Sequence, residues 1–131
     1  MPNAAQSLAA NMKVLSNHIY EFKKGVRKMV LFTCRQQCLL PAAQKLRENG
    51  IDFFSCPAEG GRNVNLFFGR PECIEAVKLI ANRPISQLSP EEDFILGTLL
   101  GYDLCTECER YCKFKRRGCK REAKTEELSE A

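Results

Sequence analysis

The sequence lacks most of the features that identify an enzyme. It holds a single histidine, His18, so a catalytic site that needs an imidazole has only that side chain to use. It has no serine nucleophile elbow, no phosphate-binding glycine loop and no dinucleotide fingerprint. We therefore assign no catalytic residue and expect a protein that acts by binding. An enzyme stays open as an alternative, because a dimer interface can assemble a site that one chain does not display.

Long apolar runs and targeting signals are also missing. No apolar run approaches the ~20 residues that span a bilayer, so we expect no membrane association. Residues 1–13 lack the basic and apolar regions of a secretory signal. We expect a cytoplasmic protein, in a compartment where thiols stay reduced. We therefore interpret the eight cysteines as core thiols, metal ligands or redox groups in preference to disulfides.

The positive charge is local. Residues 113–121 hold six basic residues and no acidic one, so the net charge of +4 leaves −2 for the rest of the chain. We expect a flexible extension over residues 1–12, one α+β domain over 13–114, and a basic then acidic tail over 115–131. The six basic residues are Lys113, Lys115, Arg116, Arg117, Lys120 and Arg121.

Two runs rich in β-branched and aromatic residues, 14–22 and 26–34, flank a short segment with Gly25, which predicts a β-hairpin. Alternation along the first run places His18 on one face of this strand, and we expect it to be an ordinary, hydrogen-bonded strand histidine. Apolar residues from Leu39 to Leu46 then recur with helical spacing and predict a helix that closes at Gly50.

Residues 51–56 and 63–69 predict two further strands, and a second helix is expected from Pro71. Ser89 and Glu92 form a capping-box pattern that predicts one long helix from Pro90 to about Cys112, with Glu91 and Asp93 as further helix-start acids. The expected fold is α+β in the order ββαββα: a four-stranded, mostly antiparallel sheet followed by one long C-terminal helix. A permuted ferredoxin-like sheet is the alternative.

Four segments together resemble the bacterial domain of unknown function 2023 family: HIYEFKKGVRKMVLFT, NLFFG, LSPEEDFILGTLLGYD and CERY. The resemblance covers residues 13–114, and the block EEDFILGTLLGYD is its most specific part. It implies a small α+β protein that forms a homodimer and has no assigned activity. It also implies a redox partner, because genes of the family neighbour flavodoxin. In this family Cys108 belongs to the shared pattern, whereas Cys105 and Cys119 are peculiar to this chain.

Three C-terminal cysteines share one side of the predicted long helix. At about 100° per residue, Cys105, Cys108 and Cys112 fall within an arc of roughly 60°. Gly97 and Gly101 extend this arc upstream into a seam of small residues, which would let another backbone approach closely. We therefore expect close packing against the chain's own sheet or a second copy, with Gly97, Gly101, Cys105 and Cys108 as the candidate dimer interface.

A metal site is the alternative for the same thiols. With Cys119, they could surround a tetrahedral zinc ion, although the ligands are more crowded than in ordinary structural zinc sites. An iron–sulfur cluster is a further alternative, but the spacing differs from that of the bacterial ferredoxin run.

The six-residue basic patch has two interpretations. It could dock an acidic redox protein such as flavodoxin, since complementary charge raises association rates. It could instead bind RNA phosphates, with Tyr111 and Phe114 available for stacking. We favour the acidic protein, because no RNA-binding module signature accompanies the patch.

Overall fold

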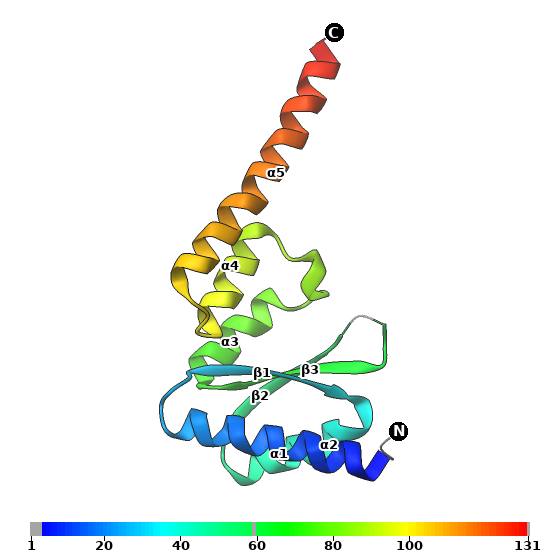
Figure 1. The fold of residues 1–131 in the computed structure, drawn as a ribbon, viewed down its shortest axis with the longest axis vertical. Helices are drawn as coiled ribbons and strands as arrows, with labels where there is room; N and C mark the ends of the chain where they lie inside the picture. Colours follow the sequence, from blue (N-terminus) through cyan, green and yellow to red (C-terminus); the bar gives the residue numbers. More distant parts are fainter. Residues whose placement is uncertain (1–3, 59, 131) are drawn as a thin grey trace.

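The computed structural model describes the backbone of residues 4–58 and 60–130, and the side chains of residues 8–58 and 60–118. All the described strands lie in the first part of the chain, among helices, and helices alone follow (Figure 1). The elements are α1 (Ala4–Lys23), β1 (Met29–Arg35), α2 (Gln36–Glu48), β2 (Asp52–Pro57), β3 (Asn63–Gly69), α3 (Pro71–Ile80), η1 (Ile85–Gln87), α4 (Pro90–Leu99) and α5 (Leu104–Glu130).

The described strands form one antiparallel sheet in the order β1-β3-β2. Met29 of β1 and Asp52 of β2 both pair with Gly69 of β3, on opposite sides of the central strand. Because β1 and β2 are each antiparallel to β3, they run parallel to one another. The unit β1–α2–β2 is therefore a split βαβ unit with β3 between its strands.

Helices cover both faces of the sheet. Helices α1 and α2 lie on one face, and α3 lies on the other with α4 and α5 stacked beyond it (Figure 1). Residues of β1 alternate between the faces: Val30 and Phe32 pack under α1 and α2, and Met29 joins the cluster on the other face. We call α1–α3 with the three strands the sheet body, and α4 with α5 the α4–α5 hairpin.

Five elements expected between residues 26 and 80 are present. The expected strand at 26–34 is β1, the helix that follows it is α2, the strands at 51–56 and 63–69 are β2 and β3, and the helix that begins at Pro71 is α3. Cys34 and Cys38 are buried in one core cluster, and Cys56 and Cys73 pack against the other. Burial raises the pKa of the Cys34 and Cys56 thiols, as expected for core cysteines.

The expected first strand is wrong, because residues 14–22 belong to helix α1. Leu15 and Ile19, four positions apart, are buried in the core, whereas Val14 and Tyr20 are exposed. The core-facing residues recur with helical spacing, and residues 4–12 of the expected extension form the start of the same helix. The described sheet consequently has three strands, not four, and the ferredoxin-like alternative fails with it.

None of the described helices is both long enough and apolar enough to cross a membrane.

Candidate functional site

The predicted single helix from Pro90 to Cys112 is wrong, since the chain turns back on itself between α4 and α5. Gly101 has φ = 78°, a left-handed conformation that ends α4. The Tyr102 amide donates to the Gly97 carbonyl at 3.1 Å, which closes the helix end. Asp103 then starts α5 by accepting hydrogen bonds from the Thr106 amide and hydroxyl, both at 2.9 Å. These bonds lower the pKa of the Asp103 carboxyl.

The turn separates the two glycines from the cysteines. Gly97 is buried, and a Cβ added there would lie 2.2 Å from Oε2 of Glu107 on α5. Its small size therefore lets α5 pack on α4 within one chain. Gly97 and Gly101 do not form a continuous seam with Cys105 and Cys108. The homodimer itself stays a prediction.

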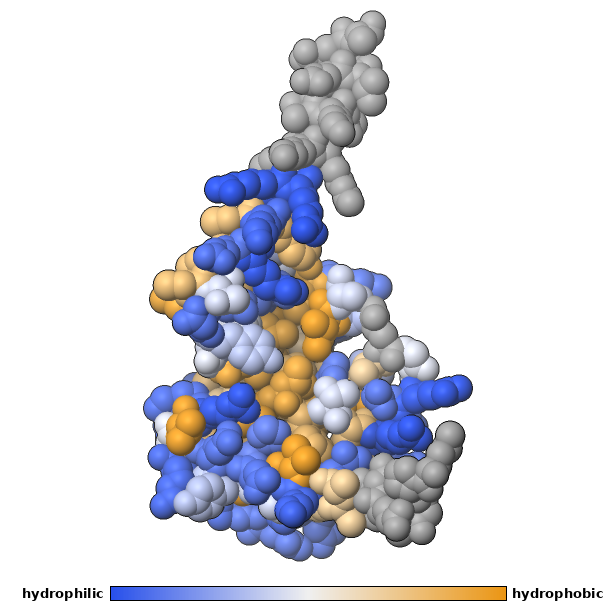
Figure 2. Space-filling view, viewed as in Figure 1, coloured by the Kyte–Doolittle hydropathy of each residue, from blue (hydrophilic) through white to orange (hydrophobic). Residues whose placement is uncertain are grey.

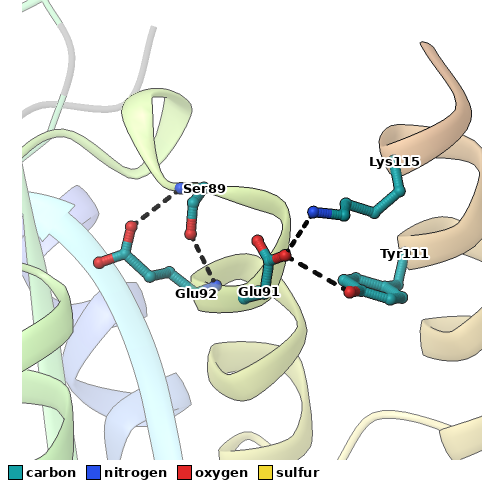
Figure 3. Close-up of polar contacts among 5 residues, drawn as sticks. All are labelled: Ser89, Glu91, Glu92, Tyr111 and Lys115. Carbon is teal, nitrogen blue, oxygen red and sulfur yellow. Dashed lines mark hydrogen bonds and ion pairs between the residues drawn. The ribbon is translucent and has the colours of Figure 1, made fainter. Parts of the chain in front are cut away.

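Polar contacts and one aromatic pair hold α5 against α4. Lys115 donates to Glu91 at 2.6 Å, and the Tyr111 hydroxyl donates to the same carboxyl at 3.4 Å (Figure 3). The Phe94 and Tyr111 rings lie 5.5 Å apart. The hydrogen bond from Lys115 is the main reason that the pKa of Glu91 is lowered. Glu91 therefore joins the two helices.

The capping box is confirmed at the start of α4. The Ser89 amide donates to Glu92 Oε1 at 2.9 Å, and the Glu92 amide donates to Ser89 Oγ at 3.1 Å (Figure 3). Asp93, expected as a helix-start acid, also accepts two bonds from Arg110, at 2.8 and 3.3 Å. Sequence reasoning missed this ion pair, because it connects two helices that were expected to be one.

The C-terminal thiols face solvent. Cys105, Cys108 and Cys112 are exposed free cysteines, so they do not pack against the chain's own sheet. Among the described side chains, no group of three or more His, Cys, Asp or Glu residues is placed to hold a metal ion. The Cys119 side chain lies outside the described residues, so the four-cysteine metal site stays a prediction.

The basic residues divide by what they contact. Lys115 is committed to the hairpin through Glu91. Lys113, Arg116 and Arg117 are exposed, and none of them pairs with an acidic side chain in the described part of the chain. The side chains of Lys120 and Arg121 lie outside it.

An open groove of about 430 Å³ runs along this side of α5. Phe114, which is 40% exposed, lies in the groove between the cationic residues. The groove can therefore offer a ligand both positive charge and an aromatic surface. Its lining residues are Thr106, Glu109, Arg110, Lys113, Phe114 and Arg117.

His18 differs from its expected role. It lies on helix α1, and its buried Nδ1 has no hydrogen-bond partner among the described residues. Its ring meets Phe32 edge-on at 6.3 Å. Burial, followed by the nearby positive charge of Arg27, lowers the pKa of His18. The neutral imidazole is therefore favoured in the folded chain.

One family model matches the chain. It is described as "Protein of unknown function (DUF2023)", and it matches residues 13–114. The match includes the whole α4–α5 turn and Cys105, Cys108 and Cys112, but Cys119 and five of the six basic residues follow it. No curated protein matches the sequence.

Proposed function

This chain belongs to the DUF2023 family, whose description names no activity. We propose that it is an accessory protein that docks an acidic protein, and the family resemblance given above implies that this partner is a redox protein such as flavodoxin. The observation that carries the proposal is the exposed cationic side of α5. Helix α5 projects from the molecule (Figure 1), and Lys113, Arg116 and Arg117 on it have no acidic partner in the described part of the chain.

The hairpin contacts support this role by fixing how α5 is presented. Arg110 and Lys115 hold the helix through Asp93 and Glu91. Lys113, Arg116 and Arg117 then stand on solvent-facing positions, and among the described side chains none of them forms an ion pair, although Glu109 lines the same groove. The positive field of these three cations raises the rate at which an acidic partner associates, and salt screens it over about 8–10 Å at ordinary ionic strength.

The cationic side follows the region that the family model matches, except for Lys113.

The test is binding of the chain to flavodoxin from the same cell, measured by surface plasmon resonance at low and high salt. Binding should weaken with salt, and the triple variant Lys113→Ala, Arg116→Ala, Arg117→Ala should weaken it by about tenfold or more at low salt. The matched control is Lys13→Ala, Arg35→Ala, Arg62→Ala, which removes three exposed cations from the sheet body. Equal loss in both variants, or no association at low salt, refutes the proposal.

RNA is the alternative ligand of the same cations. Material purified without nuclease should show no nucleic-acid absorbance that nuclease treatment removes. Nuclease-sensitive absorbance that disappears in the α5 triple variant would favour RNA over the acidic protein.

A second candidate function is metal binding through Cys105, Cys108, Cys112 and Cys119. It is favoured by the exposure of the first three thiols, which the core does not use. Zinc or an iron–sulfur cluster would take thiolate ligands of this kind. Elemental analysis of protein purified without chelator decides it: close to one zinc per chain, or iron with sulfide, supports the site, and less than about a tenth of a metal per chain rules it out.

A further inference from the structure

A pocket of about 230 Å³ lies on the inner side of the α4–α5 hairpin, away from the cationic groove. Its floor is apolar and is built from Leu31 of β1, Ile85 of η1, Leu96 of α4 and Leu100, the residue that caps the end of α4. Figure 2 shows apolar surface gathered across the waist of the molecule, between the sheet and the hairpin. The floor can therefore bury a small apolar group.

The polar end of this pocket contains Asp93, Glu107 and Arg110. Arg110 bonds Asp93 through two nitrogens, so this carboxylate already has a cationic partner. Glu107 is only 6% exposed, and no group in the described part of the chain donates a hydrogen bond to its carboxyl. The carboxyl oxygens are not fully enclosed, and the positive charge of Arg110 acts on them as well as on Asp93. Glu107 is therefore the carboxylate of this pocket whose acceptor positions are open to a ligand.

We propose that this pocket binds a small organic amine, with the protonated nitrogen donating to the Glu107 carboxylate and the apolar part resting on Leu31, Ile85, Leu96 and Leu100. A cation with N–H donors supplies hydrogen bonds to the Glu107 carboxylate and balances the second negative charge of the pocket, where Arg110 acts on both Asp93 and Glu107. An anionic ligand fits less well, because the two carboxylates outnumber the one guanidinium. The volume is below the roughly 300–1,000 Å³ of pockets for drug-sized ligands, so the amine has a short chain or a single ring.

The site is separate from the proposed docking surface, although Arg110 lines both the pocket and the outer groove. Gly97 is what brings Glu107 into the pocket, since any Cβ at that position would occupy the space of its carboxyl. This gives the buried glycine and the buried glutamate a joint role that packing alone does not require.

The test is an NMR titration of the full chain with three probes of matched length: n-hexylamine, n-hexanol and hexanoate. The amine should shift the backbone amides of Leu96, Gly97 and Glu107 and bind at least about tenfold more tightly than the alcohol, with hexanoate weakest. Equal binding of amine and alcohol, shifts located elsewhere, or no shift up to about 10 mM amine overturns the proposal.

Two variants sharpen the result. Glu107→Gln keeps the shape of the side chain but removes its charge, and it should abolish the preference for the amine over the alcohol. Glu75→Gln removes the same charge from an exposed position on α3 and should leave that preference unchanged. An amine preference that survives Glu107→Gln refutes the site. The probe comparison on the natural chain stands even where a variant folds poorly.

Discussion

The sheet body and the α4–α5 hairpin are stabilised by different interactions. The sheet body buries large apolar side chains completely, among them Leu15, Leu46, Phe67 and Phe68. Along the described side chains of α5, by contrast, the one buried residue is the acidic Glu107. Apolar burial is insensitive to salt, whereas exposed ion pairs are screened by it. The difference implies that α5 can loosen while the sheet body stays folded.

The largest expected effect is loss of a core side chain in the sheet body. Phe67→Ala removes a fully buried ring that stacks near Phe54, and it should lower the free energy of unfolding by about 3–5 kcal/mol. Leu79→Ala, at an 80% exposed position on α3, should change it by less than about 0.5 kcal/mol. Urea denaturation followed by circular dichroism measures both. Similar losses would mean that the sheet body is not the apolar core described above.

Replacing glycine by alanine should destabilise the sheet body but stabilise the α4–α5 hairpin. At Gly69 a Cβ would lie 2.3 Å from the Lys28 carbonyl oxygen and 2.7 Å from the Met29 Cα. Both are backbone atoms of the segment that pairs with β3, so Gly69→Ala should cost about 1–3 kcal/mol. Gly118 on α5 has no atom within 4 Å of an added Cβ, and Gly118→Ala should stabilise the helix by up to about 1 kcal/mol. Thermal unfolding reports the first change, and helicity at 222 nm reports the second.

Removing two acids of α4 should loosen the attachment of α5. The double variant Glu91→Gln, Asp93→Asn eliminates the ion pairs to Lys115 and Arg110. Hydrogen exchange of α5 amides should become a few-fold faster, and high salt should have the same effect on the natural chain.

The matched control for this variant is Glu72→Gln, Glu75→Gln, which removes two charges from exposed positions of α3. It should leave α5 exchange unchanged. Equal exchange in the two double variants would show that apolar contacts, chiefly Phe94 with Tyr111, position α5 without the ion pairs.

Acid should produce the smallest effects, in a different pH range for each region. The pKa of His18 is lowered from its ordinary 6.5, so the unfolded chain takes up the proton first. His18 therefore destabilises the sheet body as pH falls from about 6.5 through its folded pKa. The pKa of Glu91 is lowered mainly by Lys115, so its contribution to the hairpin is lost only at more acidic pH, below its ordinary 4.5.

The free energy of unfolding between about pH 8 and pH 5 checks the first part, with His18→Gln as the variant that should lack the dependence. Exchange of α5 amides below about pH 4.5 checks the second part, with Glu91→Gln as its control. A pH dependence that persists in His18→Gln would assign it to another group.

The elements that could be predicted are those in which local pattern and tertiary environment agree. Strand β3 alternates in sequence and is covered on both sides, and Ser89 with Glu92 forms its cap from groups three residues apart. The prediction for residues 14–22 was wrong because their β-branched and aromatic side chains favour a strand locally. Burial of Leu15 and Ile19 against the sheet favours a helix instead, and that contact is tertiary.

The candidate sites show the same limit. The basic residues were visible in the sequence, but which of them are paired was not, because Glu91 meets Lys115 only after the chain turns at Gly101. The pocket around Glu107 was missed altogether. Gly97 and Glu107 are both visible in the sequence, but on the single straight helix that was expected they would lie about 15 Å apart and could not touch.

By itself, the sequence determined the local chemistry of this protein: the α+β class, the starts of α3 and α4, the cationic segment and the thiols that follow one another at helical spacing. These depend on residues a few positions apart, where propensity, capping and charge act directly. Only the tertiary structure decided that residues 14–22 are helical, that α4 and α5 fold back on each other, and that Glu107 lies against Gly97. Each of those outcomes depends on contacts between distant segments, whose free energy no short stretch of sequence contains.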